Sequence, residues 1–144
     1  MDRKAAMDTT NDRGVVALSI PAKAEYIALC RLALTGLAQV RGFEPETLAD
    51  LKLAITEACS NSIRHGYDAD RAGVVDVRYE LSGDELAVEV VDEGAGFDLA
   101  EADVESDVLD EGGLGIAIIR SVTDELAIES HERGSRLRFV KYLS

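Results

Sequence analysis

The sequence predicts an α+β fold, a two-layer α/β sandwich in which helices cover one face of a mostly antiparallel mixed sheet. Two observations lead to this class. Apolar residues recur at helical spacing over residues 22–42 and 44–66, and later segments alternate apolar and polar residues in two pairs, each joined by a short turn. The resulting order, β-α-α-β-β-α-β-β, pairs neighbouring strands and leaves the helices to form the second layer.

The first half of the chain is expected to form one strand and two helices. Residues 15–20 (VVALSI) end at Pro21, which suits an edge strand, and the first helix should stop at Gly42. Its apolar residues at helical spacing are Ile27, Leu29, Leu32, Leu34, Leu37 and Val40. The second helix has Pro45 in its first turn, and its expected core stripe is Leu48, Leu51, Ile55, Ala58 or Cys59, and Ser62.

The second half is expected to form four strands and one helix. An apolar helix opens directly from glycines over residues 113–126, and the acidic, weakly periodic stretch 97–113 before it is expected to be a loop. The strands are predicted over 73–81, 85–94, 126–132 and 135–143.

Length and composition limit the class of protein. The 144 residues predict a flexible segment over 1–12 and a single domain over 13–144, with 47% hydrophobic residues to build its core. No apolar run approaches the ~20 residues that span a bilayer, and the N-terminus lacks an apolar signal region, so we expect a cytoplasmic protein. The net charge of −13 disfavours nucleic acid and anionic membranes as direct partners. Cys30 and Cys59 are expected to be small buried hydrophobes.

Glu57 and Asn61 form the first candidate site. They are four residues apart on the second helix, so they share one face, and helical geometry places that face away from the core stripe. A carboxylate can orient or deprotonate a hydroxyl, and an amide oxygen suits Mg²⁺. A solvated polar pair is the alternative interpretation of these two residues taken alone.

Two glycine motifs follow. In the first, a strand ends in Asp92-x-Gly94-x-Gly96, where the glycines let the backbone approach a flat ligand and the carboxylate can accept a hydrogen bond from an exocyclic amine. In the second, Gly113 and Gly115 open a helix, whose N-terminal N–H groups favour phosphate. An ordinary strand-ending turn and a glycine-rich helix start are the alternatives.

The three motifs, in this order, resemble the N, G1 and G2 boxes of the GHKL ATPase superfamily. Within it the chain resembles the small anti-sigma factor serine kinases of the RsbW and SpoIIAB type, with most likeness to RsbW, over residues 15–143. The likeness lies in IPAKAEYIALCRLALTG, DLKLAITEACSNSIRHGY, DEGGLGIAII and the closing KYL.

This resemblance implies a Bergerat-type fold that binds ATP and Mg²⁺. Glu57 would be the general base, Asn61 the magnesium ligand and Asp92 the residue that reads adenine. The nucleotide would also contact residues of the glycine boxes and one residue beyond them: Gly94, Gly96, Gly113, Leu114, Gly115 and Ser135. The expected lid, residues 98–111, contains seven acidic residues and no Lys or Arg, so phosphate charge would be met by Mg²⁺, the glycine backbone and Arg64 or Arg120.

The resemblance also implies a function. We expect a protein-serine/threonine kinase that phosphorylates a STAS-domain anti-anti-sigma factor, sequesters a sigma factor and forms a homodimer. The alternative is a non-catalytic ATP-binding module that only sequesters its partner. A histidine kinase is not expected, because the residues before Val15 leave no room for a phospho-accepting helical hairpin.

Overall fold

The computed structural model describes residues 13–66, 73–93, 111–131 and 134–143. Its elements are β1 (Arg13–Pro21), the 3-10 turn η1 (Ala24–Tyr26), α3 (Ile27–Arg41), α4 (Pro45–Gly66), β2 (Val74–Ser82), β3 (Glu85–Asp92), α6 (Glu111–Val122), β4 (Glu125–His131) and β5 (Gly134–Tyr142). The predicted order of strands and helices is confirmed. The predicted N-terminal segment, the first-box glycines Gly94 and Gly96, and nearly all of the expected lid lie outside the described residues.

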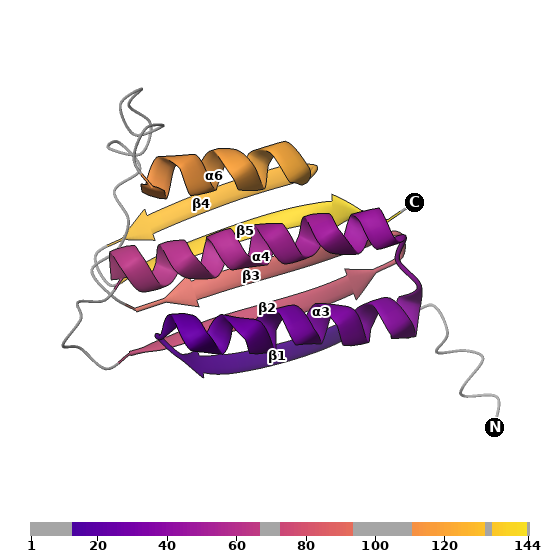
Figure 1. The fold of residues 1–144 in the computed structure, drawn as a ribbon, viewed down its shortest axis with the longest axis horizontal. Coiled ribbons are helices and arrows are strands. Elements are labelled where there is room, and N and C mark those ends of the chain that lie inside the picture. The colour runs from indigo at the N-terminus through magenta and orange to yellow at the C-terminus, as the bar shows by residue number, and fades with distance from the viewer. Residues whose placement is uncertain (1–12, 67–72, 94–110, 132–133, 144) are drawn as a thin grey trace.

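The molecule has two layers (Figure 1). Helices α3, α4 and α6 lie side by side over one face of a five-stranded sheet whose strand order is β1-β2-β3-β5-β4. The α+β sandwich is therefore confirmed. All four pairings between the described strands are antiparallel, so the sheet is more regular than the expected mixed sheet. Among the described strands, β1 pairs with β2 alone, which confirms the predicted edge strand.

The alternation of strand β2 orients the sheet. Val75, Val77 and Tyr79 are buried beneath the helices, while the intervening side chains are largely exposed on the opposite face. Tyr79 is fully buried, and its hydroxyl donates a 2.7 Å hydrogen bond to the Cys30 carbonyl oxygen of α3. This bond ties the helix layer to the sheet at its centre.

Cys30 and Cys59 are free, buried thiols, as predicted. They face each other from α3 and α4, and the hydrogen bond between them lowers the pKa of Cys30 and, together with burial, raises the pKa of Cys59. Their role in the described fold is to fill the seam between the two helices.

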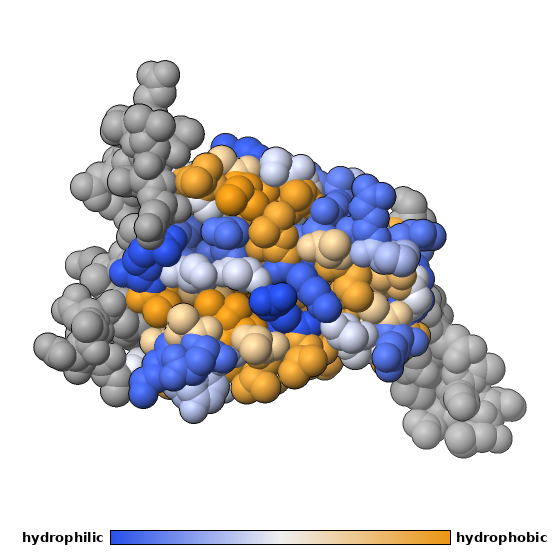
Figure 2. Space-filling model, in the orientation of Figure 1, coloured by the Kyte–Doolittle hydropathy of each residue, from blue (hydrophilic) through white to orange (hydrophobic). Residues whose placement is uncertain are grey.

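Helix α3 buries only some of its apolar residues. It ends at Gly42, whose φ of +85° is a left-handed cap conformation, and it buries Ile27, Cys30, Leu34 and Leu37. Leu29, Leu32 and Val40 are 48%, 64% and 81% exposed, so only part of the apolar spacing of this helix corresponds to the core. At 100° per residue these three share a second face, turned away from the buried stripe. Figure 2 shows hydrophobic surface over this helix.

Helix α4 confirms most of its predicted stripe. Leu51, Ile55, Ala58, Cys59 and Ser62 are buried, and Leu48 packs partly buried against the core. In the described part of the chain, no helix combines the length and apolar character needed to cross a membrane.

Candidate functional site

Glu57 and Asn61 lie on successive turns of α4, where this helix meets α6. The contact point on α6 is Gly115, which is buried. A Cβ atom added to Gly115 would lie 2.9 Å from Glu57 Oε1 and 3.7 Å from both polar atoms of the Asn61 amide. The structure therefore brings together the first and third predicted motifs. A residue with a side chain at position 115 would displace the Glu57 carboxylate.

The face of α4 that carries these residues, which the sequence places away from the core stripe, is not a solvated surface at Asn61. Its side chain is 5% exposed, and Glu57 is half-buried. The face is covered because α6, which begins about fifty residues later in the chain, packs against α4. The helical periodicity of α4 alone could identify the face that meets the sheet but not a second face that meets another helix.

The Asn61 amide is only partly satisfied. Its Oδ1 accepts a hydrogen bond from Arg64 Nη2 at 3.2 Å, and its buried Nδ2 has no partner within the described ranges. An unsatisfied buried donor costs about 1–3 kcal/mol, so such a group is expected to meet a ligand or a water molecule. The sequence interpretation had named Arg64 as a candidate for phosphate charge but had not anticipated its contact with Asn61.

These residues fit a magnesium ion. An amide oxygen is a hard ligand, and Mg²⁺ in nucleotide sites is held by one or two protein oxygens together with phosphates and waters. Among the described residues, no group of three or more His, Cys, Asp or Glu side chains forms a metal site of its own. The donor set therefore suits a cation that arrives with a nucleotide.

Asp92 and Ser135 form the second half of the site. They are opposite each other in the β3–β5 pairing, and Ser135 Oγ donates a 2.7 Å hydrogen bond to Asp92 Oδ2. Both side chains are buried, with Asp92 only 2% exposed. Gly134 permits this close approach, since a Cβ there would lie 1.9 Å from the Asp92 carbonyl oxygen. The two residues were predicted separately, and the sheet register joins them.

A small pocket links the two halves. It is lined by Ala58, Asn61, Ser62, Ile116, Ile128, Ser135 and Leu137. The apolar members were not predicted as site residues, because in the sequence they are indistinguishable from the core positions of two helices and two strands. The wall of the pocket is mostly apolar with a few polar groups, but at about 10 Å³ the pocket is much smaller than a nucleotide base, so it marks the junction of the two halves and is not itself a preformed base site.

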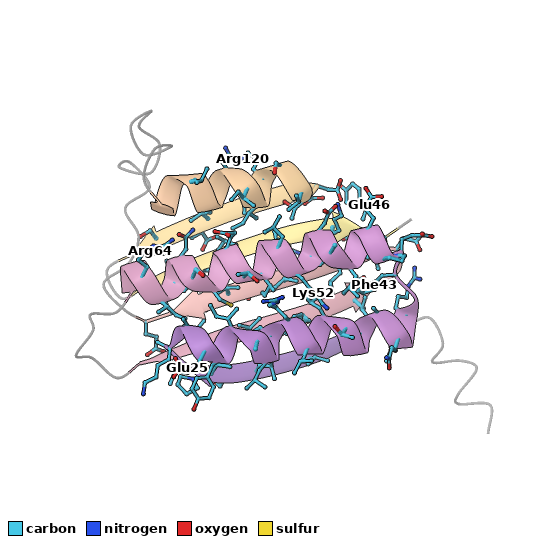
Figure 3. All side chains as sticks on the ribbon, viewed as in Figure 1. Glu25, Phe43, Glu46, Lys52, Arg64 and Arg120 are labelled. Atoms are coloured by element: carbon cyan, nitrogen blue, oxygen red, sulfur yellow. The ribbon has the colours of Figure 1, made fainter. Side chains whose placement is uncertain are left out.

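The second glycine motif lies in the first turns of α6, which begins at Glu111 rather than at Gly113. Gly113 is half-buried, Leu114 is 51% exposed and Gly115 is buried. Arg120 lies on the side of α6 that is turned away from α4, whereas Arg64 lies at the end of α4 (Figure 3). Of the two arginines named in the sequence interpretation, only Arg64 therefore lies beside the candidate site.

Comparison with known families identifies the class. A family model for the histidine kinase-like ATPase domain matches residues 20–141, which is most of the chain. The chain belongs to this family.

Particular relatives narrow the class to the RsbW type. The serine-protein kinase RsbW of Bacillus subtilis (strain 168) is 34% identical over 143 residues, which cover 93% of this chain and 89% of that protein. The structure of the RsbU and RsbW domains of Rv1364c from Mycobacterium tuberculosis aligns with a TM-score of 0.69 at 21% identity, over 90% of this chain and 32% of that one. The SiaB–SiaC complex from Pseudomonas aeruginosa aligns with a TM-score of 0.63 at 20% identity, over 96% of this chain and 95% of that one. The two structures support the fold.

Proposed function

We propose that the protein is an ATP-dependent serine/threonine kinase that phosphorylates a STAS-domain anti-anti-sigma factor and sequesters a sigma factor. The observation that carries the proposal is the meeting of Glu57 and Asn61 over Gly115. The Asp92–Ser135 pair lies across the same small pocket from Asn61. The relatives named serine-protein kinase RsbW support the reaction class.

The adenine would be read at the sheet. The Asp92 carboxylate would accept a hydrogen bond from the exocyclic amine, and the Ser135 hydroxyl holds this carboxylate in place from the neighbouring strand. The backbone N–H groups in the first turn of α6, near Gly113 and Gly115, would face the phosphates. The glycines at 94 and 96 are proposed as further nucleotide contacts from the family resemblance.

The phosphoryl transfer would take place between α4 and α6. Asn61 Oδ1 would hold Mg²⁺, which supplies positive charge to the phosphate oxygens. Glu57 would accept the proton of the partner's serine hydroxyl. The serine oxygen would form a bond to the γ-phosphorus as the bond between that phosphorus and the leaving oxygen of ADP breaks. Positioning of these groups would supply most of the rate.

Two features bear on the partners. A surface with a net charge of −13 suits a partner with a basic face. The exposed stripe of Leu29, Leu32 and Val40 on α3 is apolar enough to suit a homodimer. Light scattering, which measures the mass in solution, tests the homodimer.

A phosphotransfer assay with matched variants tests the proposal. The purified protein, its STAS-domain partner and γ-labelled ATP should yield labelled partner, and Glu57→Gln should lower the rate at least about 100-fold, because a general base typically contributes 10²–10⁴-fold. Glu46→Gln makes the same change at the other end of α4, far from Arg64 (Figure 3), and should leave the rate unchanged.

The same assay distinguishes the kinase from the alternative, a non-catalytic module that only sequesters its partner. If the wild-type protein labels no partner and Glu57→Gln matches it, the kinase is excluded. ATP binding in that case would leave the non-catalytic sequestering module as the function.

A further inference from the structure

The carbonyl oxygen of Asn61, which the proposed function assigns to a metal ion, already has a cationic partner. Arg64 Nη2 donates to Asn61 Oδ1 at 3.2 Å, three residues further along α4. The arginine also fixes the orientation of the amide. A guanidinium is only a donor, so the atom facing it must be the oxygen and the unpartnered buried atom must be Nδ2.

A guanidinium and Mg²⁺ cannot both be retained at this oxygen at low cost. Direct coordination of Mg²⁺ requires an oxygen at about 2.0–2.1 Å, and the guanidinium would then lie within a few ångströms of a divalent cation. Asn61 is 5% exposed, so little water screens the repulsion between the two cations. One of them must leave.

Arg64 is able to leave. It is exposed on the last turns of α4, and its long side chain can turn toward solvent or toward a bound anion. Phosphate oxygens offer a guanidinium charge-assisted hydrogen bonds, which are stronger than its bond to a neutral amide.

We propose that Arg64 is a positioning residue that holds the Asn61 amide ready for the metal and yields its oxygen only when the metal arrives with a nucleotide. This inference rests on the proposed function, since it needs the nucleotide site between α4 and α6. Its consequence is that Arg64 lowers the affinity of the site for the metal, because each metal-binding event must displace a resident cation.

A metal-coupling ratio measures this competition. The ratio is the dissociation constant of a fluorescent, non-hydrolysable ATP analogue in EDTA divided by that in Mg²⁺. Arg64→Gln removes the competing charge, so its ratio should exceed the wild-type ratio by about 3- to 10-fold, which corresponds to about 0.7–1.4 kcal/mol of relieved competition. Arg120→Gln is the matched control, because Arg120 lies on the far side of α6 (Figure 3), and its ratio should stay unchanged.

A second readout needs no nucleotide. In the nucleotide-free protein, Arg64→Gln should shift the side-chain amide resonances of Asn61 in a ¹H–¹⁵N spectrum, whereas Arg120→Gln should not. Loss of these resonances in Asn61→Ala identifies them.

The outcomes of these experiments distinguish the role of Arg64 from the proposed function. An unchanged or lower ratio in Arg64→Gln, with normal metal-dependent binding by the wild type, overturns the role of Arg64 and leaves the proposed function intact. Unshifted Asn61 resonances in Arg64→Gln also overturn that role. A wild-type protein that binds no ATP analogue in either condition overturns the proposed function and this inference with it.

Discussion

At Gly115, a single missing side chain permits the arrangement of the site. The backbone of α6 lies so close to α4 that a methyl group there would meet Glu57 Oε1 at 2.9 Å. The atom in the way is the end of a flexible side chain, so the fold could adapt by moving the carboxylate. Stability and catalysis should therefore respond differently to a change at this position.

Gly115→Ala should lower phosphotransfer by about 10- to 100-fold, because a displacement of about 1 Å at a reacting group costs rates of this order. Its melting temperature should stay near the wild-type value, since alanine is favoured over glycine in a helix by up to about 1 kcal/mol.

Gly36→Ala is the control for Gly115→Ala. Gly36 lies inside α3, and among the described residues no atom outside its own stretch of helix lies within 4 Å of a Cβ placed on it. This variant should be as stable as the wild type or more stable and should retain full activity. Full activity in Gly115→Ala would contradict the assigned position of Glu57.

The polar and the apolar residues of the candidate site differ in how well the sequence could predict them. Glu57, Asn61 and Asp92 could be named as candidates from the sequence, the first two by their four-residue spacing and Asp92 by the glycines that follow it, and their roles stay predictions from the family resemblance. Ile116, Ile128 and Leu137 could not, because an apolar pocket wall has the same composition as a core. Arg64 lies three residues after Asn61, a helical spacing that could have indicated the contact.

At the scale of elements, a buried hydroxyl links α3 to the sheet in addition to their apolar packing. Tyr79 Oη donates to the Cys30 carbonyl oxygen, and burial is the main cause that raises the pKa of Tyr79. Because the folded state holds the phenol neutral, its contribution to stability is complete below the unfolded pKa of about 10 and decreases as the pH rises above that value.

Tyr79→Phe should reduce the free energy of unfolding by about 0.5–1.5 kcal/mol at pH 7, the usual net value of one hydrogen bond. At pH 11 the deficit should shrink, because the wild-type tyrosine ionises on unfolding and phenylalanine does not. Urea unfolding at both pH values measures this difference. Tyr142→Phe is the control at pH 7, because it removes a hydroxyl whose hydrogen bond, to Glu125 Oε2, is exposed to solvent. A deficit at Tyr79 that grows with pH would contradict the assignment.

The elements also differ in how well their packing could be predicted. Strand β2 alternates regularly between buried and exposed residues and β3 does so in part, and a short turn joins them, so their hairpin was predictable from residues 74–92 alone. Helix α3 carries apolar residues on two faces, and periodicity could not tell that Leu34 is buried while Leu32 is exposed. The contact of α6 with α4 joins segments about fifty residues apart, and no local pattern encodes it.

At the scale of the whole molecule, the sheet order assembles the site from three separate stretches. Strand β5 lies between β3 and β4, which places Ser135 opposite Asp92. Helix α4 crosses above these strands and brings Asn61 to the same pocket as Ser135, and α6 closes the side of α4. The resemblance implied this convergence, whereas the residues by themselves implied only three separate polar motifs.

A crystal structure grown with Mg²⁺ and a non-hydrolysable ATP analogue tests the central claim most directly. The account predicts a cation bound by Asn61 Oδ1 at about 2.0–2.1 Å, the adenine amine hydrogen-bonded to Asp92, and the γ-phosphate beside Glu57. A purine bound elsewhere, or an Asn61 amide turned away from the cation, would contradict it.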